Sequence, residues 1–365
     1  MADLMFRAVD ELASMVRTGE LSARELVQES LDRIDELNPQ LNAFVDVFAD
    51  EALAEADSVG ADDPRPFAGV PIAIKNNRAV AGKRLTVAAE FMGDFVPKHD
   101  DNVVARLKAA GFIVVGTTTP DTIFPSTACV LQDKIGAHHA WGFDLGAACS
   151  GFTYSLNTAA QMVATGNCDY ALAVGADVMS SIIDYTDRAT CVLFGDGAGA
   201  VVAAPAAEGE PHILDFAGKI DGSGGPALCM PAGGSRMPAS HETVDQRMHF
   251  VKQEGATVFK FAVKNTEEIA RRVLERNGLG TADLDLFVSH QANRRIIEAA
   301  AERLGLGPDK FVVNLEMYGN TTAGTIPLAL ADARRQGRLK KGDLVLLASV
   351  GAGFTVGALL LRWSL

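Results

Sequence analysis

Short apolar segments rich in small residues alternate with helical segments over the last two thirds of the chain. The apolar segments read YALAVGADV, CVLFGDGAGAVVAA, LDLFVSH and LVLLASVGAGFTVGALLL, and residues 267–276 and 294–304 have helical periodicity. Such alternation is typical of sheets that are covered by helices. It predicts an α/β fold for this part of the chain.

Residues 1–116 have a different pattern. Ser22 and Glu25 form a capping box, and apolar residues then recur at helical spacing until Pro39. The stretch PFAGVPIAIKNN predicts a short strand that leads into Lys75. The stretch NVVARLKAAGFIVVG predicts a helix that ends at Gly111 and is followed by a buried strand. We therefore expect a second, smaller α/β layer here.

Length and charge limit the class of protein. A chain of 365 residues is long enough for two domains or for one large duplicated domain. The net charge is -13 and lysine and arginine form no cluster, which argues against nucleic acid as a partner. We find neither a secretion signal nor an apolar run of about 20 residues. We therefore expect a cytoplasmic protein without a membrane partner.

The cysteines do not follow a disulfide or metal-binding pattern. Their number is odd and no two are spaced as CxxC, so we expect reduced thiols and no metal site. The five are Cys129, Cys149, Cys168, Cys191 and Cys229.

Cys149 is the candidate nucleophile. In FDLGAACSGF an apolar strand is followed by small residues, then by the cysteine and a predicted helix. Exposed amides and the positive end of the helix dipole favour a thiolate at such a turn, and the amide of Cys149 could stabilise an oxyanion. Free cysteines are also often buried structural residues, so this motif alone leaves both interpretations open.

A histidine and an asparagine occupy similar positions further along. His290 ends the apolar strand LDLFVSH, and Asn320 lies in the turn of LEMYGNTTAG before another apolar helix. Each has a simpler explanation, since histidines are often packed or exposed and asparagine is a common turn residue. Cys149, His290 and Asn320 together, at three loop tips, predict one site.

From Thr117 to Leu365 the chain resembles beta-ketoacyl-ACP synthase III, a thiolase-fold condensing enzyme. The resemblance rests on TTTPDTIFPSTAC, AACSGFTYSL, TDRATCVLFGDGAGAVV, SHQANRRII, YGNTTAGTIP and VGAGFTVGALLLRW. It implies a layered α/β/α/β/α sandwich. It also implies condensation of an acyl-CoA, with acetyl-CoA as the first choice, and malonyl-ACP to 3-ketoacyl-ACP and CO2 in fatty-acid initiation.

The same resemblance implies the site residues. Cys149 would carry the acyl group, and His290 and Asn320 would stabilise the enolate that forms when malonyl-ACP loses CO2. No metal and no permanently bound cofactor is implied, because acyl-CoA is a substrate. A homodimer is implied through HHAWGFDL. The remaining implied residues are Arg188 and Asn293 for coenzyme A, Ala352 and Gly353 for the oxyanion, and Phe124 for the partner's acyl pocket.

Residues 1 to about 119 instead resemble the start of amidase-signature hydrolases. The resemblance rests on ELSARELVQESLDRIDELNPQLNAFV, FAGVPIAIKNN and DFVPKHDDNVVARLKAAGFIVVGTTT. It implies that Lys75 corresponds to the base of a Ser-Ser-Lys site. Asn76 stands where an aspartate is usual, and the segment with the two serines is absent from the sequence. We therefore interpret Lys75 as a catalytic relic, since a base acts only within reach of its nucleophile.

The chain is thus interpreted as a chimera of three parts. Residues 1–116 form the amidase-like fragment, 117–215 the remainder of the first thiolase-like half, and 216–365 the second half. The replaced segment is expected to remove a central strand, which leaves the first half incomplete. An inactive or misfolded chimera, an amidase-type hydrolase and another thiolase-fold enzyme that condenses acyl-CoA remain as alternatives.

Overall fold

We describe the fold from a computed structural model. It describes residues 4, 7, 9–41, 44, 47–60, 63, 68–71 and 102–365. Lys75 and Asn76 lie outside the described residues. The chain divides into two compact units, residues 1–104 and 105–365.

The first unit contains three described helices. They are α1 (Val9–Thr18), α2 (Ala23–Leu41) and α3 (Ala49–Asp57). The predicted capping box is present, because Glu25 N donates to Ser22 Oγ at 3.1 Å and Ser22 N donates to Glu25 Oε2 at 2.8 Å. The apolar faces of the helices form a small separate core of Leu12, Val16, Ala23, Leu26, Val27 and Ala56.

The second unit begins with a sheet whose strands lie in the order β2-β1-β3-β4. β1 is parallel to β2 and β3, and β4 is antiparallel to β3. The elements are α4 (Asn102–Lys108), β1 (Phe112–Gly116), α5 (Thr127–Lys134), β2 (Trp141–Leu145), η3 (Ala148–Ser150), α6 (Gly151–Ala164), β3 (Ala171–Val178), η4 (Met179–Ile182) and β4 (Asp196–Ala203).

A second sheet follows with the strand order β5-β10-β9-β8. β9 and β10 form an antiparallel hairpin, as β3 and β4 do in the first sheet. The strands are β5 (Ile213–Ile220), β8 (Leu286–Ser289), β9 (Leu344–Gly351) and β10 (Thr355–Arg362), and the short strands β6 (Leu228–Cys229) and β7 (Lys252–Gln253) pair separately. The helices are η5 (Gly222–Ala227), α7 (His241–Asp245), α8 (Gly255–Arg276), η6 (Thr281–Asp283), α9 (Arg294–Leu304), α10 (Leu315–Tyr318), η7 (Thr322–Gly324) and α11 (Thr325–Arg335).

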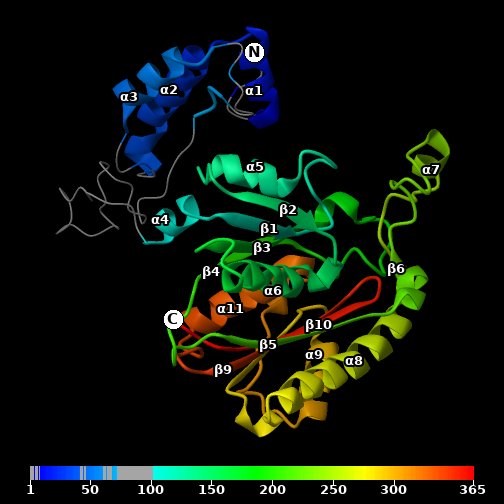
Figure 1. Cartoon of the computed structure of the whole chain (residues 1–365). Coiled ribbons are helices and arrows are strands. Elements are labelled where there is room, and N and C mark those ends of the chain that lie inside the picture. The colour runs from blue at the N-terminus through cyan, green and yellow to red at the C-terminus, as the bar shows by residue number, and fades with distance from the viewer. Residues whose placement is uncertain are drawn as a thin grey trace. The chain divides into compact units, whose positions relative to one another are not determined.

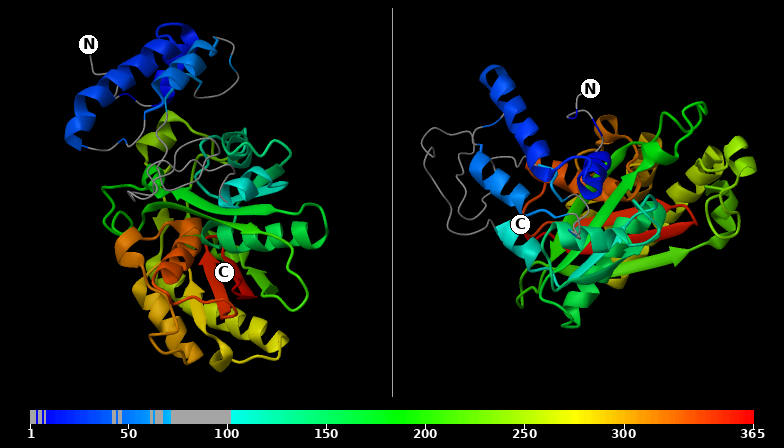
Figure 2. Two further views of the ribbon diagram at one scale, coloured as in Figure 1. Left: turned by 90° about the vertical axis from the view of Figure 1, so that its left-hand side faces the viewer. Right: turned by 90° about the horizontal axis from the view of Figure 1, so that it is seen from above.

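The elements of this unit form five layers. Helices α6 and α11 lie between the two sheets, α5 covers the outer face of the first sheet, and α8 and α9 cover the outer face of the second (Figure 1). In the left view of Figure 2 the yellow helices α8 and α9 lie below the red strands of the second sheet. One buried cluster fills the space between the sheets, and two others lie under the outer helices. The predicted α/β/α/β/α sandwich is confirmed.

Within the described residues, every helix is too short or too polar to span a lipid bilayer.

The first sheet is continuous across the point where the sequence changes character. All five residues of β1 are buried, and the strand pairs with β2 on one side and β3 on the other. The expected loss of a central strand is therefore wrong. In the second sheet β5 pairs with the outer edge of β10, whereas no described strand pairs with the corresponding edge of β4. The first half is incomplete at that edge.

Gly116, the last residue of β1, packs directly against the start of α6. A Cβ atom at this position would lie 2.5 Å from the carbonyl carbon of Gly151. Backbone atoms cannot move aside as a flexible side chain can, so the strand and the helix would have to separate. This close approach ties β1 to the helix that follows Cys149.

We expect Gly116→Ala to lower the free energy of unfolding by about 1–3 kcal/mol, because it overpacks a contact between two backbones. Gly146→Ala is the matched control, since a Cβ at Gly146 meets nothing within 4 Å. Urea unfolding followed by tryptophan fluorescence measures the effect, because both tryptophans, Trp141 and Trp363, belong to this unit. Equal midpoints for the two variants would contradict the prediction.

Candidate active site

Cys149, His290 and Asn320 line one cavity of about 490 Å³. Cys149 lies in η3 after β2, His290 directly follows β8, and Asn320 precedes η7. Each residue therefore stands where a strand or short helix ends, as the sequence predicts. The cavity also has an apolar wall, which includes Leu193, Phe194, Phe259, Ile296 and Val350.

Cys149 is held in a tight turn at the start of α6. Ala148 before it has a φ of +46°, and the Cys149 side chain is only 7% exposed. Gly351 allows β9 to approach this turn, because a Cβ there would lie 2.8 Å from Cys149 N. The backbone amides of Cys149 and Ala352 lie near enough to the sulfur to lower the pKa of the thiol. The oxyanion role of these two amides stays a prediction.

Burial dominates the protonation of Cys149. Burial, followed by the nearby charge of Asp177, raises the pKa of the thiol to about 12, while the two amides lower it. The local amides favour a thiolate, as expected from the sequence, but their effect is weaker than that of burial. At neutral pH the resting residue is a thiol.

His290 is neutral for the same physical reason. Burial lowers the pKa of its imidazole to about 3. Its backbone N–H donates to Ala348 O at 2.8 Å, which extends the pairing of β8 with β9. Nδ1 lies 2.7 Å from the Thr325 hydroxyl, which also lies 3.0 Å from Thr322 O. That hydroxyl has one proton for two acceptors, so its orientation is coupled to the histidine tautomer.

The Asn320 side chain is oriented by its own turn. Its Oδ1 atom accepts from Thr322 N at 2.9 Å, which leaves the NH2 group as the donor available to the cavity. The backbone of Asn320 is fixed on both sides, since its N–H donates to Leu193 O at 2.9 Å and its carbonyl accepts from Gly195 N at 3.0 Å.

The remaining expected residues are distributed around this cavity. Asn293 lines it and caps α9 through a 2.9 Å bond from Arg295 N to its Oδ1 atom. Arg188 is exposed and precedes Ala189, which lines the cavity. Phe124 is 84% exposed and lies outside the cavity lining, and Gly353 follows Ala352 with a φ of +138°. The roles of Arg188, Asn293, Phe124 and Gly353 stay predictions.

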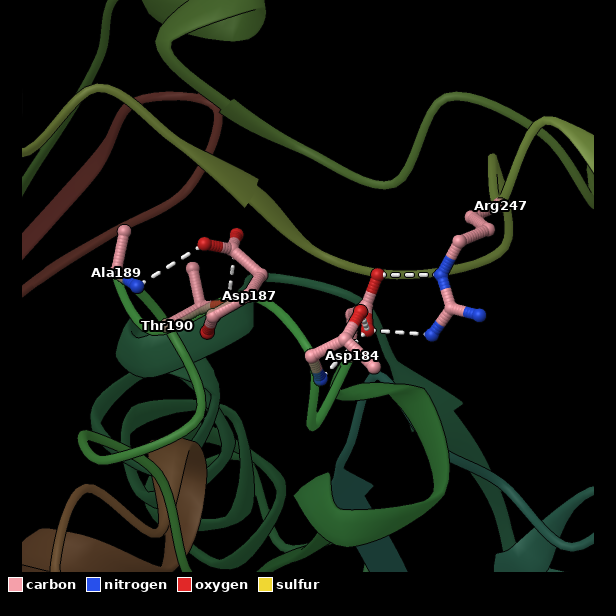
Figure 3. A network of polar contacts seen from close by, with 6 residues as sticks. Asp184, Asp187, Ala189, Thr190 and Arg247 are labelled. Atoms are coloured by element: carbon pink, nitrogen blue, oxygen red, sulfur yellow. Dashed lines mark hydrogen bonds and ion pairs between the residues drawn. The ribbon is translucent and has the colours of Figure 1, made fainter.

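An ion pair supports the turn that carries Arg188, and the sequence analysis missed it. Asp184 accepts from Arg247 Nε at 2.7 Å (Figure 3). It also accepts from the Thr186 hydroxyl at 2.6 Å. Asp187 accepts from Ala189 N at 3.0 Å, so the turn is closed locally. Hydrogen bonds from Arg247 and Thr186 hold the pKa of Asp184 below its ordinary value. Asp184 and Arg247 are 63 residues apart, and no sequence signal links them.

The described residues contain no group of three or more histidine, cysteine or acidic side chains that could bind a metal ion.

A thiol, an imidazole and a carboxamide in one cavity of a duplicated five-layer α/β fold define a thiolase-like condensing enzyme. The family models agree with this class. The model for 3-Oxoacyl-[acyl-carrier-protein (ACP)] synthase III matches residues 143–222, and the model for its C-terminal part matches residues 274–363. The chain belongs to the beta-ketoacyl-[acyl-carrier-protein] synthase III family.

Individual relatives have high identity. The synthase III of Solibacter usitatus is 61% identical over 254 residues, which are 69% of this chain and 77% of that protein. The synthase III of Koribacter versatilis is 57% identical over 253 residues, 69% of this chain and 76% of that protein. The crystal structure of the Thermus thermophilus synthase III is 42% identical, with a TM-score of 0.66, and the match covers 71% of this chain and 79% of that one.

The N-terminal region matches a different family. The Amidase model matches residues 25–134, which confirms the predicted amidase-like stretch and carries it through β1 and α5. The chain therefore joins sequence that is similar to two families.

We expect the alkylation of Cys149 by iodoacetamide to become about tenfold faster per pH unit between pH 7 and 10, because only the thiolate reacts and the pKa is about 12. Mass spectrometry of the Cys149 peptide measures the rate separately from the other four cysteines. A short unstructured peptide with one cysteine is the control, since its rate levels off above the ordinary thiol pKa near 8.5. A plateau for Cys149 below pH 9 would show that the amides dominate over burial.

Proposed function

We propose that this chain is a beta-ketoacyl-ACP synthase III that condenses an acyl-CoA, in the first instance acetyl-CoA, with malonyl-ACP to give 3-ketoacyl-ACP and CO2. The observation that carries the proposal is the single cavity lined by Cys149, His290 and Asn320, with the amides of Cys149 and Ala352 at the sulfur. The family of the chain supports it independently.

The first step is acyl transfer to Cys149. The sulfur attacks the thioester carbonyl, the bond from that carbonyl to the sulfur of coenzyme A breaks, and the thiol proton leaves with coenzyme A as its free thiol. Negative charge develops on the carbonyl oxygen during the attack. The amides of Cys149 and Ala352 are fixed by the turn and by β9, so they can stabilise this oxyanion without reorganising.

The second step is decarboxylative condensation. Malonyl-ACP loses CO2, the carbanion attacks the acyl carbonyl on Cys149, and the bond from carbon to sulfur breaks to release 3-ketoacyl-ACP. The cysteine sulfur then regains a proton. His290 and the NH2 group of Asn320 donate to the thioester oxygen of the malonyl group as its enolate forms. With Nδ1 at Thr325, this requires the imidazole proton on Nε2, and the Thr325 hydroxyl then donates to Nδ1.

Asn293 and Arg188 are proposed to hold coenzyme A at the cavity entrance. Asn293 lines the cavity, and the Asp184–Arg247 ion pair fixes the turn that carries Arg188. We infer that the enzyme acts in the cytoplasm, where its substrates are made available by soluble carriers.

A second copy of the chain is the proposed partner at the edge strand β2. Trp141 and Phe143 of β2 are exposed, as are Ile123 and Phe124 in the loop between β1 and α5. Large apolar side chains gathered at a sheet edge support a dimer in which Phe124 reaches the partner's acyl pocket.

Two alternatives from the sequence have less support. A misfolded chimera is disfavoured by the continuous first sheet and its fully buried β1. For an amidase-type hydrolase, the base Lys75 lies outside the described residues, and the sequence has no serine-rich segment to accompany it. Amide hydrolysis that is lost in Lys75→Ala would be required to revive that alternative.

We expect the protein incubated with acetyl-CoA to gain one acetyl group on Cys149, and to lose it when malonyl-ACP is added. Intact-mass measurement and peptide mapping follow both steps, and Cys149→Ala is the control that should remain unmodified. If Cys149 is never acylated by acetyl-CoA or by longer and branched acyl-CoAs, the proposed function is wrong.

We expect Thr325→Val to slow condensation about tenfold while acyl transfer to Cys149 stays within about twofold, since the change removes one hydrogen bond to His290. Single-turnover measurements of each half-reaction separate the two steps. Thr325→Ser keeps the hydroxyl and should restore condensation. Equal losses in both half-reactions would assign Thr325 to general stability.

A further inference from the structure

Asp177 is a buried carboxylate beside the site that the two proposed chemical steps do not use. It lies near the end of β3, is 3% exposed, and accepts five hydrogen bonds. None of them comes from a lysine or arginine. Hydroxyls and backbone amides therefore stabilise this buried carboxylate, and no cationic side chain is among its hydrogen-bond donors.

One oxygen of Asp177 fixes the turn that follows β1. Its Oδ1 atom accepts from Thr118 N at 2.7 Å and from the hydroxyls of Thr117, Thr118 and Thr119 at 3.2, 3.0 and 3.0 Å. Thr119 in turn accepts from Val178 N at 2.8 Å. The three threonines are therefore bound to the end of β3.

The other oxygen reaches the second half of the fold. Its Oδ2 atom accepts from Ala323 N at 3.0 Å. Ala323 belongs to η7, next to Thr322, whose N–H holds the Asn320 side chain, and two residues before Thr325, the partner of His290. One carboxylate thus joins the threonine turn of the first half to the turn that orients Asn320 and His290.

We propose that Asp177 is a positioning residue that fixes the Asn320 turn against the first half of the fold, and so sets the rate of condensation rather than of acyl transfer. The proposal rests on the proposed function for its rate effects. An asparagine cannot replace the carboxylate, because both carboxylate oxygens accept hydrogen bonds. The NH2 group of an asparagine would face a backbone N–H, either that of Thr118 or that of Ala323, and could not accept from it.

The charge of Asp177 has a second consequence that can be measured without any substrate. Burial is the larger cause that raises the pKa of the Cys149 thiol, and the charge of Asp177 is the second. The other ionisable side chains that line the cavity are Lys260, His290 and Arg295, and none of these is changed by a substitution at Asp177. Removing the charge should therefore lower the pKa of Cys149.

The test compares Asp177→Asn with Thr118→Val in the full chain. Thr118→Val removes one hydrogen bond to the carboxylate and keeps its charge. We expect Asp177→Asn to speed the alkylation of Cys149 by iodoacetamide at pH 8 about threefold or more, to slow condensation about tenfold or more, and to leave the KM for acetyl-CoA within twofold. Thr118→Val should leave the alkylation rate unchanged.

Condensation at the parental rate in Asp177→Asn would overturn the positioning role of Asp177, and equal alkylation rates in both variants would overturn the effect of its charge on Cys149. The alkylation measurement needs no turnover, so it tests the charge of Asp177 separately from the proposed function. If Asp177→Asn does not fold, Asp177→Glu takes its place, because it keeps the charge and displaces the carboxylate. That variant should lose condensation and keep the parental alkylation profile, and normal condensation would overturn the proposal.

Discussion

The pairing of β1 with both of its neighbours is the constraint on which the rest of the second unit depends. β1 aligns β2, which leads into Cys149, with β3, which ends near Asp177. A strand between two parallel neighbours must pair its backbone on both sides and bury both faces. Those requirements are satisfied by five residues, FIVVG, with apolar side chains and a terminal glycine that admits α6. They do not specify a family, which explains how amidase-like sequence can supply this strand.

The site keeps its reactive groups uncharged until substrate arrives. Burial holds Cys149 as a thiol and His290 as a neutral imidazole, so neither group bears the cost of an isolated buried charge. Charge develops only during the reaction, on oxygen atoms of the substrate. The amides of Cys149 and Ala352 and the carboxamide of Asn320 are dipoles fixed beforehand by β9 and by the turn at Thr322. In the proposed mechanism the thiol is therefore activated by oriented dipoles and not by a low resting pKa.

The parts of this arrangement that sequence reasoning could predict are those carried by short local patterns. Cys149, His290 and Asn320 each follow a strand or precede a helix, and these positions can be read from periodicity and small residues. The pairs Asp184 with Arg247 and Asp177 with Ala323 are separated by 63 and 146 residues, and only the folded chain brings them together. The position of the open edge was missed for the same reason, because strand order is a property of distant pairings. The resting state of Cys149 was misjudged because burial, which the sequence does not give, exceeds the local effect of the amides.

The open edge of β4 lies apart from the elements that carry the side chains of the cavity. The catalytic side chains are delivered by the ends of β2 and β8 and by the turn before η7, and they are braced by β1, β3 and β9. All of these strands except β2 and β8 are interior to their sheets. The difference between the halves lies on the far side of β4, where alternate residues from Asp196 to Ala200 are exposed. Unpaired backbone groups at an exposed edge can form hydrogen bonds with water. The loss of strand pairing at this edge therefore lowers the stability of the first sheet and leaves the cavity unchanged. The geometry of the cavity depends instead on Asp177, which joins the threonine turn to η7 one strand further in.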